Sequence, residues 1–159
     1  LDHGGLETIE SYRGISDDEK QQHLDFFEGM PLYHIDSEKR LFVHAGFTSM
    51  HGVEKEYDKV NFYFDRTLWE MALTMDKRID KNSEIYPNRL KNYSEIYIGH
   101  TPTINFKHDK PMKAVNVWNV DTGAAFTGKL SAIDIETKDV FQSDILMELY
   151  PNELGRNKG

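Results

Sequence analysis

The sequence contains no cysteine, which excludes disulfide bonds, thiolate metal ligands and cysteine nucleophiles. It has no apolar run near the roughly 18 residues that a membrane span needs, and its first residues show no basic-then-apolar signal pattern. Lys and Arg number 19 against 27 Asp and Glu, and the resulting formal charge of −8 disfavours a general binder of nucleic acid. These absences predict a cytoplasmic protein with no nucleic-acid or membrane partner.

The size and composition of the chain favour one folded unit. Its 159 residues, of which 38% are hydrophobic and 12% aromatic, are enough to bury one core and too few for two separate domains. No internal repeat or linker-like stretch interrupts the sequence. We therefore assign residues 1–148 to one domain and residues 149–159 to a polar tail.

Local patterns predict an alternation of helices and short strands, which is typical of an α/β fold. They indicate a helix over residues 16–31 that begins with the capping box SDDE, a hairpin from residues 32–35 and 40–46, an irregular loop over residues 47–64, a helix over residues 65–75, a polar exposed segment over residues 76–92, a strand over residues 96–98 and a hairpin over residues 129–142. Leu24 and Phe27 lie on one face of the first helix, and Gly29 and Pro31 end it.

Two of the apolar strands end in a histidine that has a glycine within two residues of it. His44 follows one strand in the word FVHAG, and His100 follows another in the word YIGHT. Imidazole is the commonest protein ligand of first-row divalent metals, and side chains at strand ends project into crevices of layered α/β proteins. The spacing alone leaves two interpretations open: the two histidines share a metal ion, or each is a hydrogen-bonded turn residue.

Three words in this order, LFVHAGF, YIGHTPT and NVDTGA, resemble the C-terminal half of calcineurin-like metallophosphoesterases. The branch they resemble comprises bacterial serine/threonine protein phosphatases and diadenosine tetraphosphatases. The opening stretch HGGLETIESY resembles the part of that family that follows its Gly-Asn-His motif, so the resemblance spans roughly residues 3–135. It implies that residues 1–148 are the C-terminal portion of a four-layer α/β/β/α sandwich with mixed sheets.

The resemblance also implies roles for particular residues. His44 and His100 correspond to ligands of the second metal in a two-metal centre that holds Mn, or Fe and Zn. Arg66, in the word RTLWE, corresponds to an arginine that helps to hold phosphate, although related sequences commonly place it after the tryptophan. A surface arginine at a helix start therefore stays the alternative for Arg66. Asp121 is expected to be structural and not a ligand.

Aromatic residues gather between the two histidine words. They are predicted to pack in the core or a loop, with a wall that contacts substrate as the alternative, and they are Phe62, Tyr63, Phe64 and Trp69. No other histidine has a comparable context.

The family motifs Asp-x-His, Gly-Asp-x-x-Asp-Arg-Gly and Gly-Asn-His do not occur in the sequence. They carry the remaining metal ligands and the catalytic histidine, so we expect them upstream of Leu1 and expect the chain to be inactive alone. The complete enzyme would hydrolyse phosphate esters by attack of a metal-activated hydroxide on phosphorus. A phosphorylated protein, a dinucleoside polyphosphate and a small phosphomonoester are all compatible substrates.

Two other interpretations stay open. The chain can be a truncated or degenerate fragment that binds a metal or a partner without turnover, or a small β-rich module whose two histidines are coincidental. An incomplete sandwich would expose a sheet edge and apolar faces, which predicts self-association of the fragment.

Overall fold

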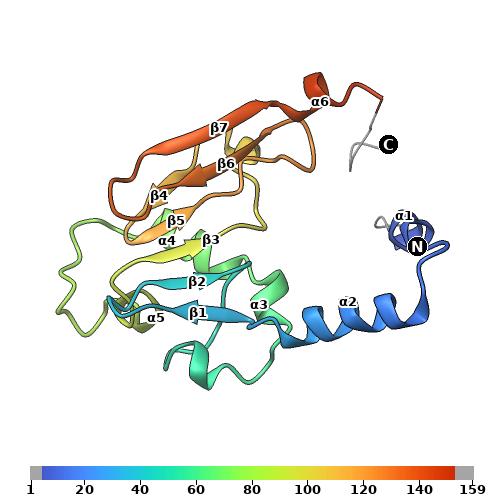
Figure 1. Cartoon of the computed structure of the whole chain (residues 1–159). Coiled ribbons are helices and arrows are strands. Elements are labelled where there is room, and N and C mark those ends of the chain that lie inside the picture. The colour runs from blue at the N-terminus through green and yellow to red at the C-terminus, as the bar shows by residue number, and fades with distance from the viewer. Residues whose placement is uncertain (1–4, 153–159) are drawn as a thin grey trace.

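The structure of the chain, a computed structural model, describes residues 5–152, and its centre is a five-stranded mixed sheet (Figure 1). The strands are β1 (Tyr33–Ile35), β2 (Leu41–Val43), β3 (Ile96–Ile98), β4 (Met112–Ala114) and β5 (Val117–Asn119), in the order β1-β2-β3-β5-β4. Strands β2, β3 and β5 are parallel, whereas β1 and β4 pair antiparallel at the two edges. The predicted α/β class with a mixed sheet is confirmed.

One face of this sheet carries the hydrophobic core. The helices over this face are α3 (Asn61–Phe64), α4 (Thr67–Thr74) and α5 (Asn88–Lys91). Two short 3-10 helices, η1 (Val53–Lys55) and η2 (Thr103–Phe106), lie in the loops. Helix α4 contacts β4 and β5, and its buried residues Leu68, Trp69 and Ala72 join Leu41 and Val117 of the sheet in one cluster. The predicted helix over residues 65–75 is thus confirmed.

Two predicted loop segments contain more structure than the sequence indicated. The aromatic word NFYF, expected in an irregular loop, forms helix α3, since Phe62 is only 3% exposed and anchors it in the core. The segment 76–92, expected to be exposed, contributes Tyr86 and Leu90 to the core. The loop prediction was wrong for NFYF, whereas most residues of segment 76–92 are exposed as predicted and its buried exceptions are the side chains that join the core.

The opposite face of the sheet is lined by stacked aromatic rings. Phe42, Tyr97 and Trp118 lie on adjacent strands with ring centroids 5.0 and 6.4 Å apart and nearly parallel planes. The predicted hairpin of β6 (Lys129–Ile133) and β7 (Val140–Ile145), followed by α6 (Leu146–Leu149), lies beside this face. Its turn residue Lys138 donates to Glu95 at 2.5 Å and to the hydroxyl of Tyr97 at 2.6 Å, which fixes the hairpin to the sheet.

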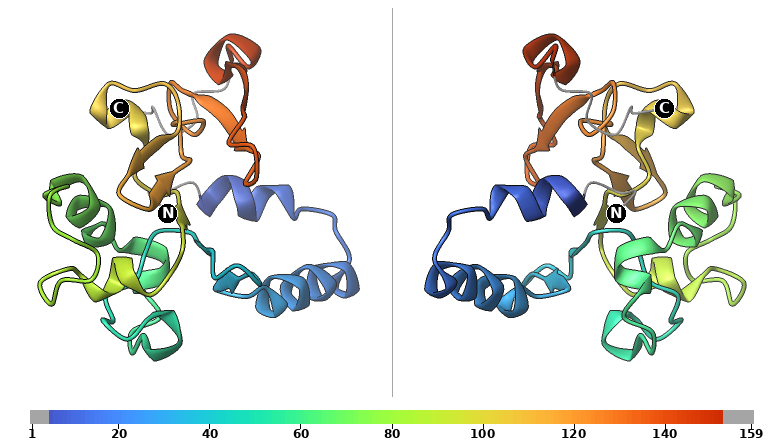
Figure 2. Two further views of the ribbon diagram at one scale, coloured as in Figure 1. Left: turned by 90° about the vertical axis from the view of Figure 1, so that its left-hand side faces the viewer. Right: turned by 90° about the vertical axis from the view of Figure 1, so that its right-hand side faces the viewer.

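Helices α1 (Gly5–Ser11) and α2 (Asp17–Gly29) project to one side of the sheet, as Figures 1 and 2 show. The Ser16 hydroxyl accepts a hydrogen bond from the backbone N–H of Glu19, so the predicted cap is present. No residue of α2 is buried, however, and Phe27 of its apolar face is 56% exposed. Within residues 5–152, no helix has the length and apolar composition that a membrane span requires.

A close approach of two chain segments sets the position of α4. The buried carboxylate of Asp65 accepts hydrogen bonds from the backbone N–H groups of Thr67 and Leu68, which caps the helix start. Gly46 lies directly against this carboxylate, because a Cβ atom at Gly46 would stand 2.5 Å from Asp65 Oδ2 and 3.2 Å from the Cβ of Leu68. The absence of a side chain at Gly46 therefore allows the segment after β2 to contact α4.

Replacing Gly46 by alanine is expected to lower the free energy of unfolding by about 1–3 kcal/mol, because the added methyl must displace the helix cap. Urea unfolding of the variant measures this change. Gly29→Ala is the control, since a Cβ atom there meets nothing within 4 Å. Equal stabilities of the two variants would contradict the proposed close approach.

Candidate active site

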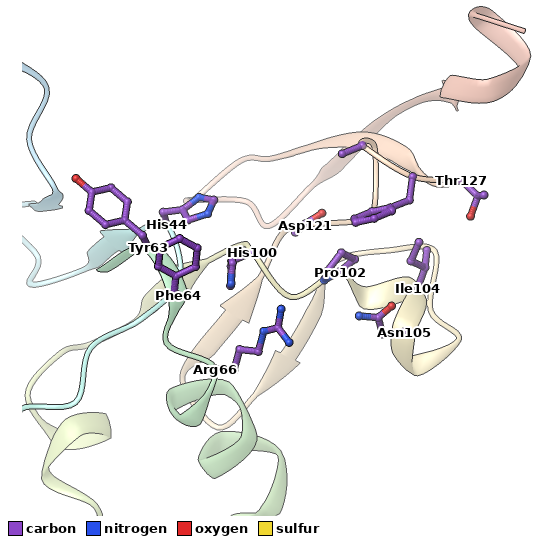
Figure 3. Close-up of a pocket in the computed structure, with 12 residues that line it drawn as sticks. His44, Tyr63, Phe64, Arg66, His100, Pro102, Ile104, Asn105, Asp121 and Thr127 are labelled. Carbon is purple, nitrogen blue, oxygen red and sulfur yellow. The ribbon is translucent and has the colours of Figure 1, made fainter. Parts of the chain in front are cut away.

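The rings of His44 and His100 meet at the carboxyl edge of the sheet, with centroids 5.2 Å apart and planes inclined by 63° (Figure 3). His44 directly follows β2, and His100 lies two residues after β3. Because β2 and β3 are parallel neighbours, their carboxyl ends lie side by side and bring the two imidazoles together. His44 is exposed and His100 is half-buried, so both can be reached by a ligand from solvent.

Backbone contacts hold this pair in place. The N–H of Gly99 donates to the carbonyl oxygen of His44 at 2.8 Å, which ties the two strand ends to each other. His100 has a φ of 67°, in the left-handed region that residues with a side chain rarely adopt. Such conformations cost of order 1–3 kcal/mol and concentrate at functional sites.

The end of the third parallel strand, β5, supports the His100 loop. The fully buried amide of Asn119 donates to the carbonyl oxygen of Thr101 at 2.7 Å. The backbone carbonyl of Asp121 accepts from the N–H of Thr103 at 2.8 Å, and its carboxylate accepts from the N–H of Gly123 at 2.9 Å. These hydrogen bonds from the NVDTG segment fix the position of the GHTPT segment. Asp121 also lines the cleft described below.

The two histidines open onto a cleft of about 710 Å³. Its lining comes from four segments of the chain and comprises His44, Tyr63, Phe64, Arg66, His100, Pro102, Ile104, Asn105, Asp121, Ala125, Phe126 and Thr127. Arg66, the residue expected to hold phosphate, is exposed at the start of α4 and lies in the same cleft as the two imidazoles (Figure 3). All three site residues that the sequence singled out therefore share one cavity.

The four clustered aromatic residues divide into two groups. Phe62 and Trp69 are 3% and 1% exposed and belong to the core, as the sequence favoured. Tyr63 and Phe64 line the cleft instead, and the alternative of a wall that contacts substrate stays a prediction for these two residues. The backbone N–H of Ala45 donates to the carbonyl oxygen of Phe62 at 3.0 Å, so α3 and its aromatic side chains are held beside His44.

A carboxylate fixes the loop that joins the HAG word to α3. Glu56 accepts hydrogen bonds from the backbone N–H groups of Thr48 and Ser49 and from the side-chain amide of Asn61, the first residue of α3. Burial raises the pKa of the Glu56 carboxyl, but these hydrogen bonds lower it more, so that the pKa lies below its ordinary value. Glu56 was not predicted from the sequence, because its role depends on contacts between residues up to eight positions apart.

The donor atoms of the site fit part of a metal centre. Imidazole nitrogens are ligands that suit first-row divalent ions such as Fe and Zn. Within residues 5–152, no group of three or more histidine, aspartate or glutamate side chains is arranged to hold a metal ion. The described residues thus bring together two candidate ligands, whereas a tetrahedral or octahedral ion takes four to six.

No protein-family model matches the chain. It is similar to proteins named asymmetrical bis(5'-nucleosyl)-tetraphosphatase PrpE: the relative from Bacillus cereus is 31% identical over 142 residues, which are 82% of this chain and 52% of the relative. Relatives from Bacillus anthracis and Bacillus thuringiensis are 30% identical over 152 residues, or 87% of this chain and 56% of each relative. The chain spans about half the length of the curated relatives it matches. The predicted resemblance to the tetraphosphatase branch of calcineurin-like phosphoesterases is confirmed.

The hydrogen bonds to Glu56 predict a pH effect. A carboxyl whose pKa is lowered by folding contributes stability above its unfolded pKa and loses it as pH falls through the folded pKa. The backbone amide signals of Thr48 and Ser49 should therefore titrate in NMR spectra with a midpoint below the value of about 4.3 typical of glutamate. Glu56→Gln should abolish this titration, whereas Glu54→Gln should preserve it. A titration midpoint at or above the ordinary pKa of glutamate would contradict the hydrogen bonding assigned to Glu56.

Proposed function

Since the chain is similar over more than four fifths of its length to asymmetrical bis(5'-nucleosyl)-tetraphosphatases, we propose that it belongs to a metal-dependent phosphoester hydrolase. Its substrate in this proposal is a dinucleoside polyphosphate. The observation that carries the proposal is the contact of the His44 and His100 rings, 5.2 Å apart at parallel strand ends. The chain then corresponds to the C-terminal portion of such an enzyme, as its motifs predict.

In this proposal His44 and His100 bind one of two divalent ions, Mn or a pair of Fe and Zn, through neutral imidazole nitrogens. Two such ions, when bound, lower the pKa of a water molecule and neutralise charge on the phosphate oxygens. The fold contributes by fixing the separation of the two rings, because the hydrogen bond from Gly99 to the carbonyl of His44 joins the loops that carry them. The remaining ligands come from protein outside residues 5–152.

Arg66 binds the phosphate chain of the substrate in this proposal. Its guanidinium presents several N–H donors in a planar arrangement that matches phosphate oxygens. The cleft holds one carboxyl group in its lining, that of Asp121, which is engaged with the N–H of Gly123. The charge around Arg66 therefore suits an anionic ligand better than the overall negative charge of the chain suggests.

The names of the relatives favour a dinucleoside polyphosphate over a phosphoprotein. The predicted serine/threonine phosphatase activity stays the second candidate for the complete protein, because the histidine words occur in both groups of the branch. Hydrolysis of diadenosine tetraphosphate and of a phosphoserine peptide by the complete gene product distinguishes the two. Turnover of neither substrate, together with metal binding, would favour the non-catalytic alternative.

Replacing either His44 or His100 by alanine should reduce metal-dependent hydrolysis of diadenosine tetraphosphate by the complete gene product by at least about 100-fold. Removal of a group that merely supports a metal ligand already costs about 10–100-fold, so loss of a ligand should cost more. His108→Ala is the control, since this exposed residue does not line the cleft. Unchanged activity in both cleft variants would refute the ligand assignment.

A further inference from the structure

Two aromatic side chains of α3 face the cleft with much of their surface in solvent. Phe64 is 66% exposed and Tyr63 is 47% exposed, whereas their neighbour Phe62 is buried. The fold thus uses Phe62 to anchor α3 and leaves the next two rings without a core role. Adjacent exposed aromatic residues inside a cavity are typical of a binding surface, because their apolar area gains free energy when a ligand covers it.

The exposed rings continue directly from the histidine pair. The ring centroid of Phe64 lies 5.8 Å from that of His100, with an interplanar angle of 83°, and the ring of Tyr63 lies 6.4 Å from that of Phe64. Figure 3 shows the two aromatic residues next to the imidazoles, with Arg66 and Asn105 farther along the cleft. A flat group that covers Phe64 is therefore adjacent to the reacting end of the site.

We propose that Tyr63 and Phe64 form a stacking surface for one nucleobase of the substrate, an inference that rests on the proposed function. A nucleobase is flat and has a π-face, and stacking on an aromatic side chain is worth about 1–3 kcal/mol per base. Arg66, which follows α3 in the same cleft, then faces the phosphates attached to that nucleoside. The cleft would thereby bind both chemical parts of a nucleotide. The base would contact α3, and the phosphate would lie near Arg66 and the two histidines.

This placement also bears on which bond is cleaved. Because the ring of Phe64 adjoins that of His100, a base stacked there keeps the phosphate nearest its own ribose close to the imidazole pair. Water then adds across the first P–O–P bridge: its hydroxyl goes to one phosphorus, and the bridging oxygen leaves with the other phosphorus and takes up the proton. The products are a nucleoside monophosphate and a nucleoside triphosphate, which are unequal, as the name of the relatives states.

Binding of AMP to the chain itself tests the stacking surface independently of catalysis. NMR titration should shift the ring protons of Tyr63 and Phe64, and Phe64→Ala should weaken AMP binding about 5-fold or more, as expected from the loss of one stacking contact. Phe64→Trp should retain the affinity. Phe141→Ala is the control, because Phe141 is 64% exposed but lies on β7 outside the cleft.

Ribose 5-phosphate separates base recognition from a general effect on the cleft. Its affinity should be equal in the wild-type chain and Phe64→Ala, since it has no base to stack. If Phe64→Ala loses equal affinity for AMP and ribose 5-phosphate, or loses affinity for neither, the proposal is overturned. If the variant loses affinity only for a phosphoserine peptide, the proposal is overturned in favour of a protein substrate.

The complete gene product provides the second test. With diadenosine tetraphosphate, Phe64→Ala should raise KM and form some ADP beside AMP and ATP, because the base no longer fixes the position of the phosphate chain. The fall in kcat/KM should be larger for diadenosine tetraphosphate than for a phosphoester without an aromatic group. An unchanged product ratio with an unchanged KM would contradict the inference. If AMP stacks as proposed but no phosphoester is hydrolysed, the proposed function fails and the base site stands.

Discussion

The site depends on the parallel pairing of β2, β3 and β5, which brings the loops that follow these three strands to one edge of the sheet. A hydrogen bond of 2.8 Å from the Gly99 N–H to the His44 carbonyl joins the loop after β3 to the loop after β2. The buried side chain of Asn119, at the end of β5, donates to the carbonyl oxygen of Thr101 and so joins β5 to the loop after β3. The separation of the two imidazoles is therefore set by backbone contacts of the sheet and not by contacts of the rings alone.

This arrangement explains why short words in the sequence carry so much of the prediction. An apolar run followed by His and Gly identifies a buried strand and its end, and two such runs predict neighbouring strand ends. The contacts around the pair were less predictable. The division of NFYF into the buried Phe62 and the exposed Phe64 depends on which side of a single helical turn meets the core. Sequence periodicity cannot resolve this over four residues.

The exposed part of the fold was predicted least well. The capping box fixed the start of α2, because capping depends on residues within one turn. The apolar side chains of α2 nevertheless remain in solvent within the described structure, with Phe26 66% and Leu24 53% exposed. Self-association of the chain, which was expected from the exposed sheet edge and apolar faces of an incomplete sandwich, stays a prediction. Within residues 5–152 the candidate metal site comprises two histidines and no third ligand, and the chain spans about half the length of its curated relatives.

In the proposed metal site, His44 and His100 together bind a divalent ion. Addition of substoichiometric Mn²⁺ to the chain, followed by NMR of the imidazole protons, tests it most directly, because a bound paramagnetic ion broadens the signals of nearby protons first. If the two histidines share an ion, the signals of His44 and His100 should broaden together and before those of His23 and His108, which lie outside the cleft. Equal broadening of all histidine signals, or broadening that spares this pair, would contradict it.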